Sequence, residues 1–554
     1  MHIGASFCIY PATAALLKSC LPLILLTLLL AWRANAVADW IRAAWILRKL
    51  DRPPGNVVYS GVRRLLTGKR LRVMQAVNES VVGGSGVFYY NLLWGHMVVV
   101  SEPRIVAELL HNTSLAKPTQ PVMVHFRQLM SPHGRADFLS AEGDSEDWLW
   151  RTVRRGVAPA FAPRSLRAAY PKVAQVGARL TEILQSRPQH EAIDMCNVCM
   201  CETIDALGLA GFNKAFNSIE AITLGKQADL LHVIFTANEE VARGLYNPAY
   251  KLLQMLPGPR SAGQLCIRRF HTIMQDLLQE LKARGPPADD DDSLAAHLLR
   301  IRDPGTGQLL SDEWLLPQIS VMFWAGFDTT GNTMAWTLYC ISQHPEVQKK
   351  IADELGEHGL LAVPDQPLPR SPDYADLDKL TYLTCVIKEA MRVHTVVGLP
   401  TLRMSKHKDL LVDNGSLLIP RNTTIWIPLG LPHASSAIYK NADQFIPQRW
   451  LEPNAEYMPT HSQAADKNVA SDRVSRFLPF SDGKRQCVGM AFAKMNYTSI
   501  LARLLGTFTF ELAQQMGGSQ GVMEAENYAI TLMPSKGMWM HCRSRVKQAV
   551  AVTV

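Results

Sequence analysis

Three hydrophobic patterns divide the chain. Near the N-terminus, a continuous apolar run covers residues 21–32. Between residues 73 and 100, short apolar runs alternate with glycine-rich turns, which predicts a few strands of a small sheet. After Glu102, apolar residues recur at helical spacing over most of the remaining length. We therefore predict a mainly α protein with a smaller β part.

The longest helix is expected between a capping residue at Ser311 and Gln343, with Pro345 opening the next helix. Its sequence is apolar over most of its length, so we expect it to be largely buried. Its middle, residues 325–331, reads Ala-Gly-Phe-Asp-Thr-Thr-Gly, a group of poor helix formers. Local preferences that oppose the surrounding element are typical of a functional site.

The N-terminal apolar run predicts a membrane anchor. The uncharged stretch at residues 19–32 is shorter than the roughly 20 residues that span a bilayer, although Lys18 can extend it by snorkelling. Basic residues follow it, which favours retention of the downstream chain in the cytoplasm. A cleaved signal peptide or a plastid-targeting segment is the alternative, because Ala34-Asn-Ala36 resembles a cleavage site. We assign residues 1–52 to the anchor and its basic flank, and residues 53–554 to one folded domain.

Composition excludes several classes of protein. The chain has 554 residues, 47% of them hydrophobic, and its formal net charge of +8 is spread along the sequence, which gives no indication of nucleic-acid binding. Ten cysteines are too few for a disulfide scaffold in a chain of this length. Cys196, Cys199 and Cys201 lack a histidine cluster or a second pair, so we interpret them as buried helix residues rather than a metal site. The acidic residues 289–292 are interpreted as a surface linker.

Residues 480–489, Phe-Ser-Asp-Gly-Lys-Arg-Gln-Cys-Val-Gly, carry the strongest chemical signal. Cys487 precedes a helix-forming run, where free N–H groups and the helix dipole are expected to lower the pKa of its thiol. Gly483 and Gly489 are expected to let the backbone curl where a Cβ could clash. A lone thiolate suits the axial ligand of a haem iron better than a zinc site, and a buried structural cysteine is the alternative.

This decapeptide resembles the haem-binding loop of the cytochrome P-450 family, Phe-x-x-Gly-x-x-x-Cys-x-Gly. The resemblance extends from about Pro53 to about Arg545 and implies the cytochrome P-450 fold behind the anchor. Four further motifs occur in the family's order: Trp150-x-x-x-Arg154, Ala325-Gly-x-Asp-Thr-Thr330, Glu389-x-x-Arg392 and Phe445-Ile-Pro-Gln-Arg449.

The resemblance implies a haem b cofactor with Cys487 as its axial thiolate. Phe480 would shield the thiolate side of the haem, and Gly483 and Gly489 would shape the loop. The haem propionates would bind one aromatic and three basic side chains: Trp150, Arg154, Arg403 and Arg485.

The family resemblance also implies roles for residues on two helices. Thr329 would hydrogen-bond activated dioxygen and Asp328 would relay protons, in a helix kinked at this point. Glu389 and Arg392 would face each other on a helix, and Arg449 would complete a buried network that braces the cysteine loop. Two departures from the family pattern, Ser481 and Gln448, leave the haem site intact.

The implied activity is a monooxygenase that inserts one oxygen atom of O2 into a lipophilic organic substrate. No dinucleotide fingerprint or ferredoxin-like cysteine series is present, so the electrons would come from an NADPH-dependent reductase or a ferredoxin. Membrane lipid would contact the N-terminal segment, with the domain on the cytoplasmic side of the endoplasmic reticulum or, alternatively, in a plastid. A haem-thiolate isomerase or dehydratase without a reductase, and a haem sensor without turnover, are the alternatives.

If the N-terminal run is an uncleaved anchor that keeps the domain in the cytoplasm, glycosylation triplets should remain unmodified. The test is the electrophoretic mobility of the full-length protein from eukaryotic cells before and after endoglycosidase treatment, and a shift would contradict the anchor. Five asparagines carry the triplet: Asn78, Asn112, Asn414, Asn422 and Asn496.

Overall fold

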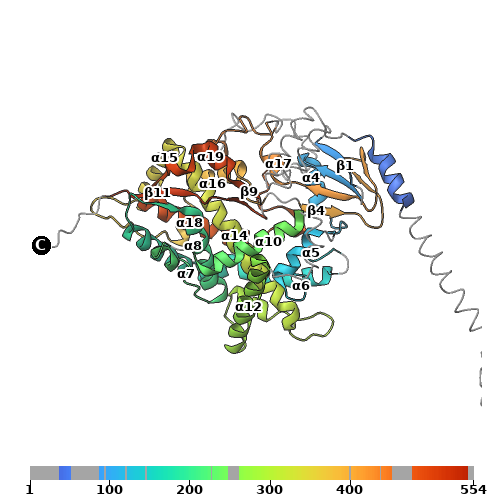
Figure 1. Ribbon diagram of the computed structural model, residues 1–554, viewed down its shortest axis with the longest axis horizontal. Helices are drawn as coiled ribbons and strands as arrows, with labels where there is room; N and C mark the ends of the chain where they lie inside the picture. The colour runs from blue at the N-terminus through green and yellow to red at the C-terminus, as the bar shows by residue number, and fades with distance from the viewer. Residues whose placement is uncertain are drawn as a thin grey trace, which may run out of the picture.

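Helices form most of the described chain, as the apolar spacing predicted (Figure 1). The computed structural model describes residues 37–50, 86–92, 95–118, 121–143, 146–225, 227–246, 261–397, 401–436, 438–451, 477–528 and 530–546. Residues 37–47 are helical. The further helices are α4 (Pro103–His111), α5 (Pro121–Met130), α6 (Asp147–Val157), α7 (Pro163–Ser186), α8 (Met195–Phe212), α9 (Glu220–Thr223), α10 (Asp229–Tyr246), α12 (Ala262–Ala283), α13 (Leu294–Leu299), α14 (Asp312–Ser342), α15 (Pro345–Glu357), α16 (Thr381–Val393), α17 (Gly430–His433), α18 (Met490–Thr507) and α19 (Gly518–Glu524).

Strands form the smaller part, and the largest sheet joins distant segments. Its order is β1-β2-β7-β4, with β2 antiparallel to β1 and parallel to β7. Only its first two strands belong to the region where the sequence predicted strands, and residues 73–85 of that region lie outside the described residues. The strands are β1 (Val87–Leu92), β2 (Gly95–Val100), β3 (Ala192–Asp194), β4 (Thr401–Met404), β5 (Leu410–Val412), β6 (Leu417–Ile419), β7 (Thr424–Ile427), β8 (Phe508–Leu512), β9 (Glu526–Tyr528), β10 (Leu532–Pro534) and β11 (Trp539–Ser544).

The core is organised around α14, which crosses the centre of the molecule between the helices and the four-stranded sheet (Figure 1). Ser311 is its N-cap residue and Gln343 its C-cap residue, so the predicted ends are confirmed. Helices α8, α16 and α18 pack against it. The helix α18 starts directly after the cysteine loop. Its packing against α14 therefore brings the loop close to the central helix.

Among the described residues, α8 is long and apolar enough to cross a membrane, but 89% of it is buried inside the molecule. It is therefore a core helix. Cys196, Cys199 and Cys201 are buried in it, as the sequence predicted. The predicted anchor at residues 21–32 lies outside the described residues.

The helix at residues 37–47 is bound to the rim of the β part. Arg42 pairs with Asp409, and Arg421 pairs with Asp39 at 2.8 Å. The opposite side of this helix exposes a row of large apolar side chains at a spacing of one helical turn: Val37, Ile41 and Trp45.

Candidate active site

The cysteine loop is a closed turn in front of α18. The N–H of Cys487 donates to the carbonyl of Phe480 at 3.0 Å. Within the turn, the Asp482 carboxylate accepts from the N–H of Gly483 at 2.7 Å. Gly489 is the N-cap residue of α18. The structure therefore confirms the predicted order of turn, cysteine and helix.

Only one of the two glycines has the predicted steric role. Gly483 has φ of +70°, and a Cβ there would lie 2.2 Å from the carbonyl oxygen of Leu110. Gly489 has φ of −85°, and its Cβ would meet nothing closer than a Phe161 ring carbon at 3.8 Å. The predicted clash is therefore correct for Gly483 and wrong for Gly489. Ser481, where many members of the family have glycine, adopts a left-handed φ of 59°.

The predicted lowering of the Cys487 thiol pKa is also wrong in its net direction. Burial raises the pKa of this thiol more than the N–H groups of Gly489 and Met490 and the Arg154 guanidinium lower it. The reason is that removing a thiolate from water raises its free energy more than these two hydrogen bonds and the nearby guanidinium charge lower it. Nevertheless, Cys487 is the one cysteine in the described chain whose residue is exposed, although protein atoms crowd around its thiol.

Two arginines beside the loop, the buried Arg403 and the half-buried Arg485, have little compensating negative charge. Arg403 on β4 is 4% exposed, and its Nη2 has no hydrogen-bond partner among the described residues. Arg485 has one carboxylate partner, Asp147, whose Oδ1 is 3.8 Å from its Nη2. Burial lowers the pKa of both Arg403 and Arg485 to about 10, and Arg403 also contributes to the lowering at Arg485. Such a pair fits the anionic propionates of a haem.

Trp150 and Arg154 lie next to this pair, on the same face of α6. The guanidinium of Arg485 lies 4.3 Å from the ring centroid of Trp150, a cation–π contact. Nη1 of Arg154 donates to the carbonyl of Gln486 at 2.7 Å, so this arginine is directed at the cysteine loop. The structure thus brings all four predicted propionate residues to one side of the loop.

Sequence reasoning missed a fifth member of this cluster, Lys117. Its Nζ donates to the carbonyl of Leu139. Burial and the nearby Arg485 lower the pKa of Lys117 to about 7. Lys117 belongs to none of the five motifs, so its spacing gave no signal. No signal in the sequence points to Lys117, because the bridge between Ala116 and Met404 that brings it beside β4 joins distant segments of the chain.

Asp328 and Thr329 lie in the middle of α14. Asp328 is 1% exposed, and burial raises the pKa of its carboxyl to about 6. The Thr329 hydroxyl donates to the carbonyl of Ala325 at 3.1 Å, in its own helix. The helix α14 runs without interruption through this region, so the expected kink with a freed carbonyl stays a prediction.

Glu389, Arg392 and Arg449 form the predicted buried network. The carboxylate of Glu389 pairs at 2.9 Å with both Arg392 and Arg449, and all three side chains are buried. The same carboxylate accepts from the N–H of Ile446 and from the indole of Trp450, each at 2.9 Å. With its lone pairs occupied in this way, the charge is stabilised without water.

His433 connects this network to the cysteine loop. Arg392 donates to its carbonyl at 2.9 Å, and its Nε2 accepts from the N–H of Leu478 at 2.9 Å. Its Nδ1 therefore carries the proton and donates to the Thr395 hydroxyl at 3.0 Å. Leu478 in turn accepts from the N–H of Ser481 at the start of the loop. Burial lowers the pKa of His433 to about 3, so it stays neutral near pH 7.

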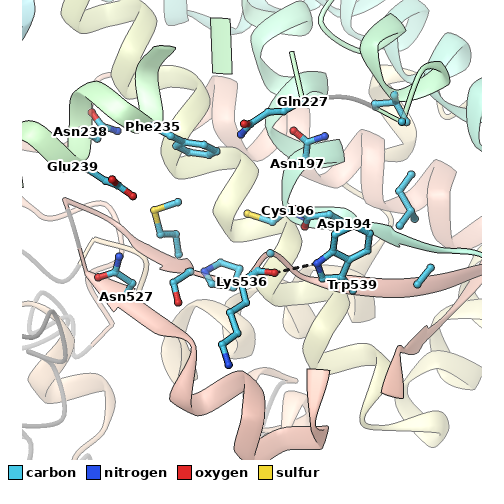
Figure 2. A pocket seen from close by; sticks show the side chains of 18 of the residues that line it. Asp194, Cys196, Asn197, Gln227, Phe235, Asn238, Glu239, Asn527, Lys536 and Trp539 are labelled. Atoms are coloured by element: carbon cyan, nitrogen blue, oxygen red, sulfur yellow. Dashed lines mark hydrogen bonds between the residues drawn. The ribbon is translucent and has the colours of Figure 1, made fainter. Parts of the chain in front are cut away.

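A cavity of about 430 Å³ lies apart from these residues (Figure 2). Its walls come from β3, α8, α10 and the C-terminal strands, and include Asp194, Cys196, Asn238 and Trp539. None of the predicted site residues lines it. The polar side chains of Asp194 and Asn238 already serve the fold, as acceptors for Met538 N–H and for the indole of Trp324.

Known proteins resemble the chain over most of its length. A family model described as Cytochrome P450 matches residues 58–540, a range that contains every residue of the candidate site. The chain is 27% identical over 528 residues to cytochrome P450 monooxygenase 205 of Postia placenta, covering 87% of this chain and 90% of that protein. It is 25% identical over 441 residues to cytochrome P450 3A41 of Mus musculus, covering 77% and 80%. It is also 25% identical to the bifunctional cytochrome P450/NADPH–P450 reductase 2 of Bacillus subtilis, covering 70% of this chain and 34% of that protein.

The two loop glycines should respond differently to alanine. Gly483→Ala places a Cβ against the Leu110 carbonyl and forces a left-handed alanine, so the purified protein should lose thermal stability and haem content. Gly489→Ala should leave the thermal stability of the haem-free polypeptide near that of the parent. Equal loss of stability in both variants would contradict this account of the loop.

The Glu389 network should be worth far more than a surface pair. Glu389→Gln leaves two buried guanidinium groups without a carboxylate and should lower the free energy of unfolding by roughly 3–5 kcal/mol. Glu511→Gln is the matched control, because it breaks a 2.8 Å pair with Arg543 that is exposed on both sides, and should cost under about 1 kcal/mol. Urea unfolding of both variants measures the difference, and similar costs would show that the network does not brace the fold.

Proposed function

The chain belongs to the cytochrome P450 family and is a monooxygenase, and we propose that it inserts one oxygen atom of dioxygen into a lipophilic substrate at a haem b whose axial ligand is Cys487. The observation that carries this proposal is a group of cations beside the cysteine loop, of which Arg403 is buried and Arg485 and Lys117 are half-buried. Three cations, Arg403, Arg485 and Lys117, lie close enough to affect one another's pKa values. The negative charge around them is too small to neutralise them. A dianionic cofactor would supply that charge.

The residues around Cys487 fit the cofactor in separate ways. When bound, haem with an axial thiolate supplies reductive cleavage of dioxygen. Cys487 provides the sulfur ligand, and the N–H groups of Gly489 and Met490 support its charged form. Trp150 and Arg154 extend the propionate site from α6. Phe480 stabilises the turn through its backbone carbonyl, and we propose that its ring shields the thiolate side of the haem.

Asp328 and Thr329 are proposed to deliver protons. A carboxyl whose pKa is about 6 is present in both its protonated and its charged form near neutral pH, which suits proton transfer. Thr329 offers a hydroxyl on the next residue of α14 and belongs to the same motif.

Both protons and electrons must reach the site, and we propose that a separate NADPH-dependent reductase or a ferredoxin supplies the electrons.

We further propose that residues 1–52 anchor the catalytic domain, residues 53–554, to the endoplasmic reticulum membrane, with a plastid as the alternative. The apolar run at residues 21–32 and the basic residues after it support this assignment. The row of exposed apolar side chains on residues 37–47 adds support, because a helix that follows an anchor closely lies at the lipid surface.

The spectrum of the reduced protein with carbon monoxide tests the haem-thiolate assignment. The wild-type protein should show the thiolate-ligated band, and Cys487→Ala should lose it. If the band is absent from the wild-type protein, the proposed function is wrong.

Oxygen chemistry is tested separately with a panel of fatty acids, sterols, terpenoids and carotenoids. Product formation should require both NADPH and dioxygen, whereas an isomerase or dehydratase would need neither. Thr329→Ala should lower the product formed per NADPH by at least about tenfold. Thr337→Ala removes a buried hydroxyl that bonds only to a carbonyl in its own helix, and should have little effect. Equal losses in the two variants would contradict the role of Thr329.

A further inference from the structure

One hydrogen bond links the C-terminal hairpin to the middle of α14. The Thr531 hydroxyl donates to Oδ2 of Asp328 at 2.7 Å, although the two residues are 203 positions apart in the chain. Their exposed fractions are 4% and 1%, so water does not compete freely for this bond. Within the described chain Asp328 forms no salt bridge, and the neutral hydroxyl of Thr531 is the side-chain donor that reaches its carboxyl.

The position of Thr531 is determined by the residue that follows it. The N–H of Leu532 donates to the carbonyl of Val396 at 2.8 Å, just after α16. The carbonyl of Leu532 accepts from the indole N–H of Trp336 at 3.1 Å, on α14. These two bonds hold the start of β10 against α14 on one side and against the segment after α16 on the other. The Thr531 hydroxyl can therefore leave Asp328 only if its own side chain rotates or this backbone pairing opens.

Asn332 determines where the Thr531 proton points. Its Nδ2 donates to the backbone carbonyl of Asp328 at 3.0 Å and lies 3.4 Å from Oγ1 of Thr531. An amide nitrogen can only donate, so Thr531 accepts from Asn332 and donates its own proton to the carboxylate. The hydroxyl is thus used as an acceptor on one side and as a donor on the other.

A titratable group from another helix, Cys196 on α8, lies close to Asn332 and is affected by the charge of Asp328. Its Sγ lies 3.8 Å from Oδ1 of Asn332, and it lines the cavity shown in Figure 2. Burial raises the pKa of Cys196 well above its usual value, so it stays neutral. Cys196 therefore contacts Asn332 from the cavity side, and neither residue provides a positive charge.

We propose that Thr531 is a positioning residue of the active site, which holds the Asp328 carboxyl in the orientation from which it passes protons toward Thr329. This inference rests on the proposed function of Asp328. Burial raises the pKa of that carboxyl and the Thr531 hydrogen bond lowers it. Without the hydroxyl, the carboxyl would stay protonated to a higher pH and would be free to rotate.

The first experiment needs no turnover. Infrared difference spectra of the full-length resting holoenzyme, made with isotope-labelled aspartate, follow protonation of Asp328, and Asp328→Asn identifies the band. The wild-type midpoint should lie near 6. Thr531→Val should raise it by about one pH unit, a tenfold change in proton affinity. Thr531→Ser should restore the wild-type midpoint, and Thr337→Val should not change it.

The second experiment measures proton delivery without a substrate. With NADPH and a reductase, one dioxygen takes two electrons and two protons to form hydrogen peroxide, or four of each to form two waters. Thr531→Val should raise the ratio of peroxide released to dioxygen consumed, and Thr531→Ser should not. Thr531→Ala is the second variant if valine prevents folding.

A Thr531→Val protein that titrates like the wild type would overturn the proposal. A shifted titration with an unchanged peroxide ratio would also overturn it, because the bond would then serve stability alone. Failure of the proposed function is recognised separately, by a wild-type protein without the thiolate band or without NADPH-dependent oxygen uptake. In that case the positioning role falls with it, while the infrared titration still measures the bond.

Discussion

The burial of positive charge beside the cysteine loop is the constraint on which the rest of the site depends. Moving a guanidinium group out of water is costly unless an anion or several acceptors replace the solvent. Around Arg403 and Arg485 the described chain offers few of either, in contrast to Arg392, whose guanidinium meets a carboxylate and three backbone carbonyls. Within the described chain Arg403 forms no ion pair and Arg485 has only Asp147 at 3.8 Å, whereas Arg392 is already satisfied.

This contrast distinguishes residues that are suited to bind a ligand from residues that stabilise the fold. The Glu389 network is saturated with hydrogen bonds and can only stabilise the fold around it. His433 connects this network to the cysteine loop, because its ring accepts a hydrogen bond from the N–H of Leu478. In the turn that follows Leu478, the backbone at Gly483 lies close to Leu110. The loop thus presents Cys487 from a rigid support, as a ligating residue requires.

Much of this could be predicted from the sequence, because the relevant signals are local. Ser311, Gln343 and Pro345 mark the ends of helices, and these caps lie where they were expected. Motif spacing found the residues that we propose to bind the haem propionates, and it found the Glu389 network. It could not find Lys117, His433 or Thr531, because each acts through partners that are distant in the chain. No periodicity relates Thr531 to Asp328, since only the packing of the hairpin against α14 brings them together.

Local sequence therefore established which groups are present and in which turns and helices they lie. It indicated a cysteine before a helix, an aspartate beside a threonine in an apolar helix, and glycines in a turn. Their final properties were set by packing. Burial raises the pKa of Cys487 by more than the helix terminus lowers it. Gly489 has room for a Cβ, and Asp328 has a hydrogen-bond partner near the C-terminus. The physical reason is that desolvation and steric contact sum over all neighbours in space, and most of those neighbours are remote in sequence.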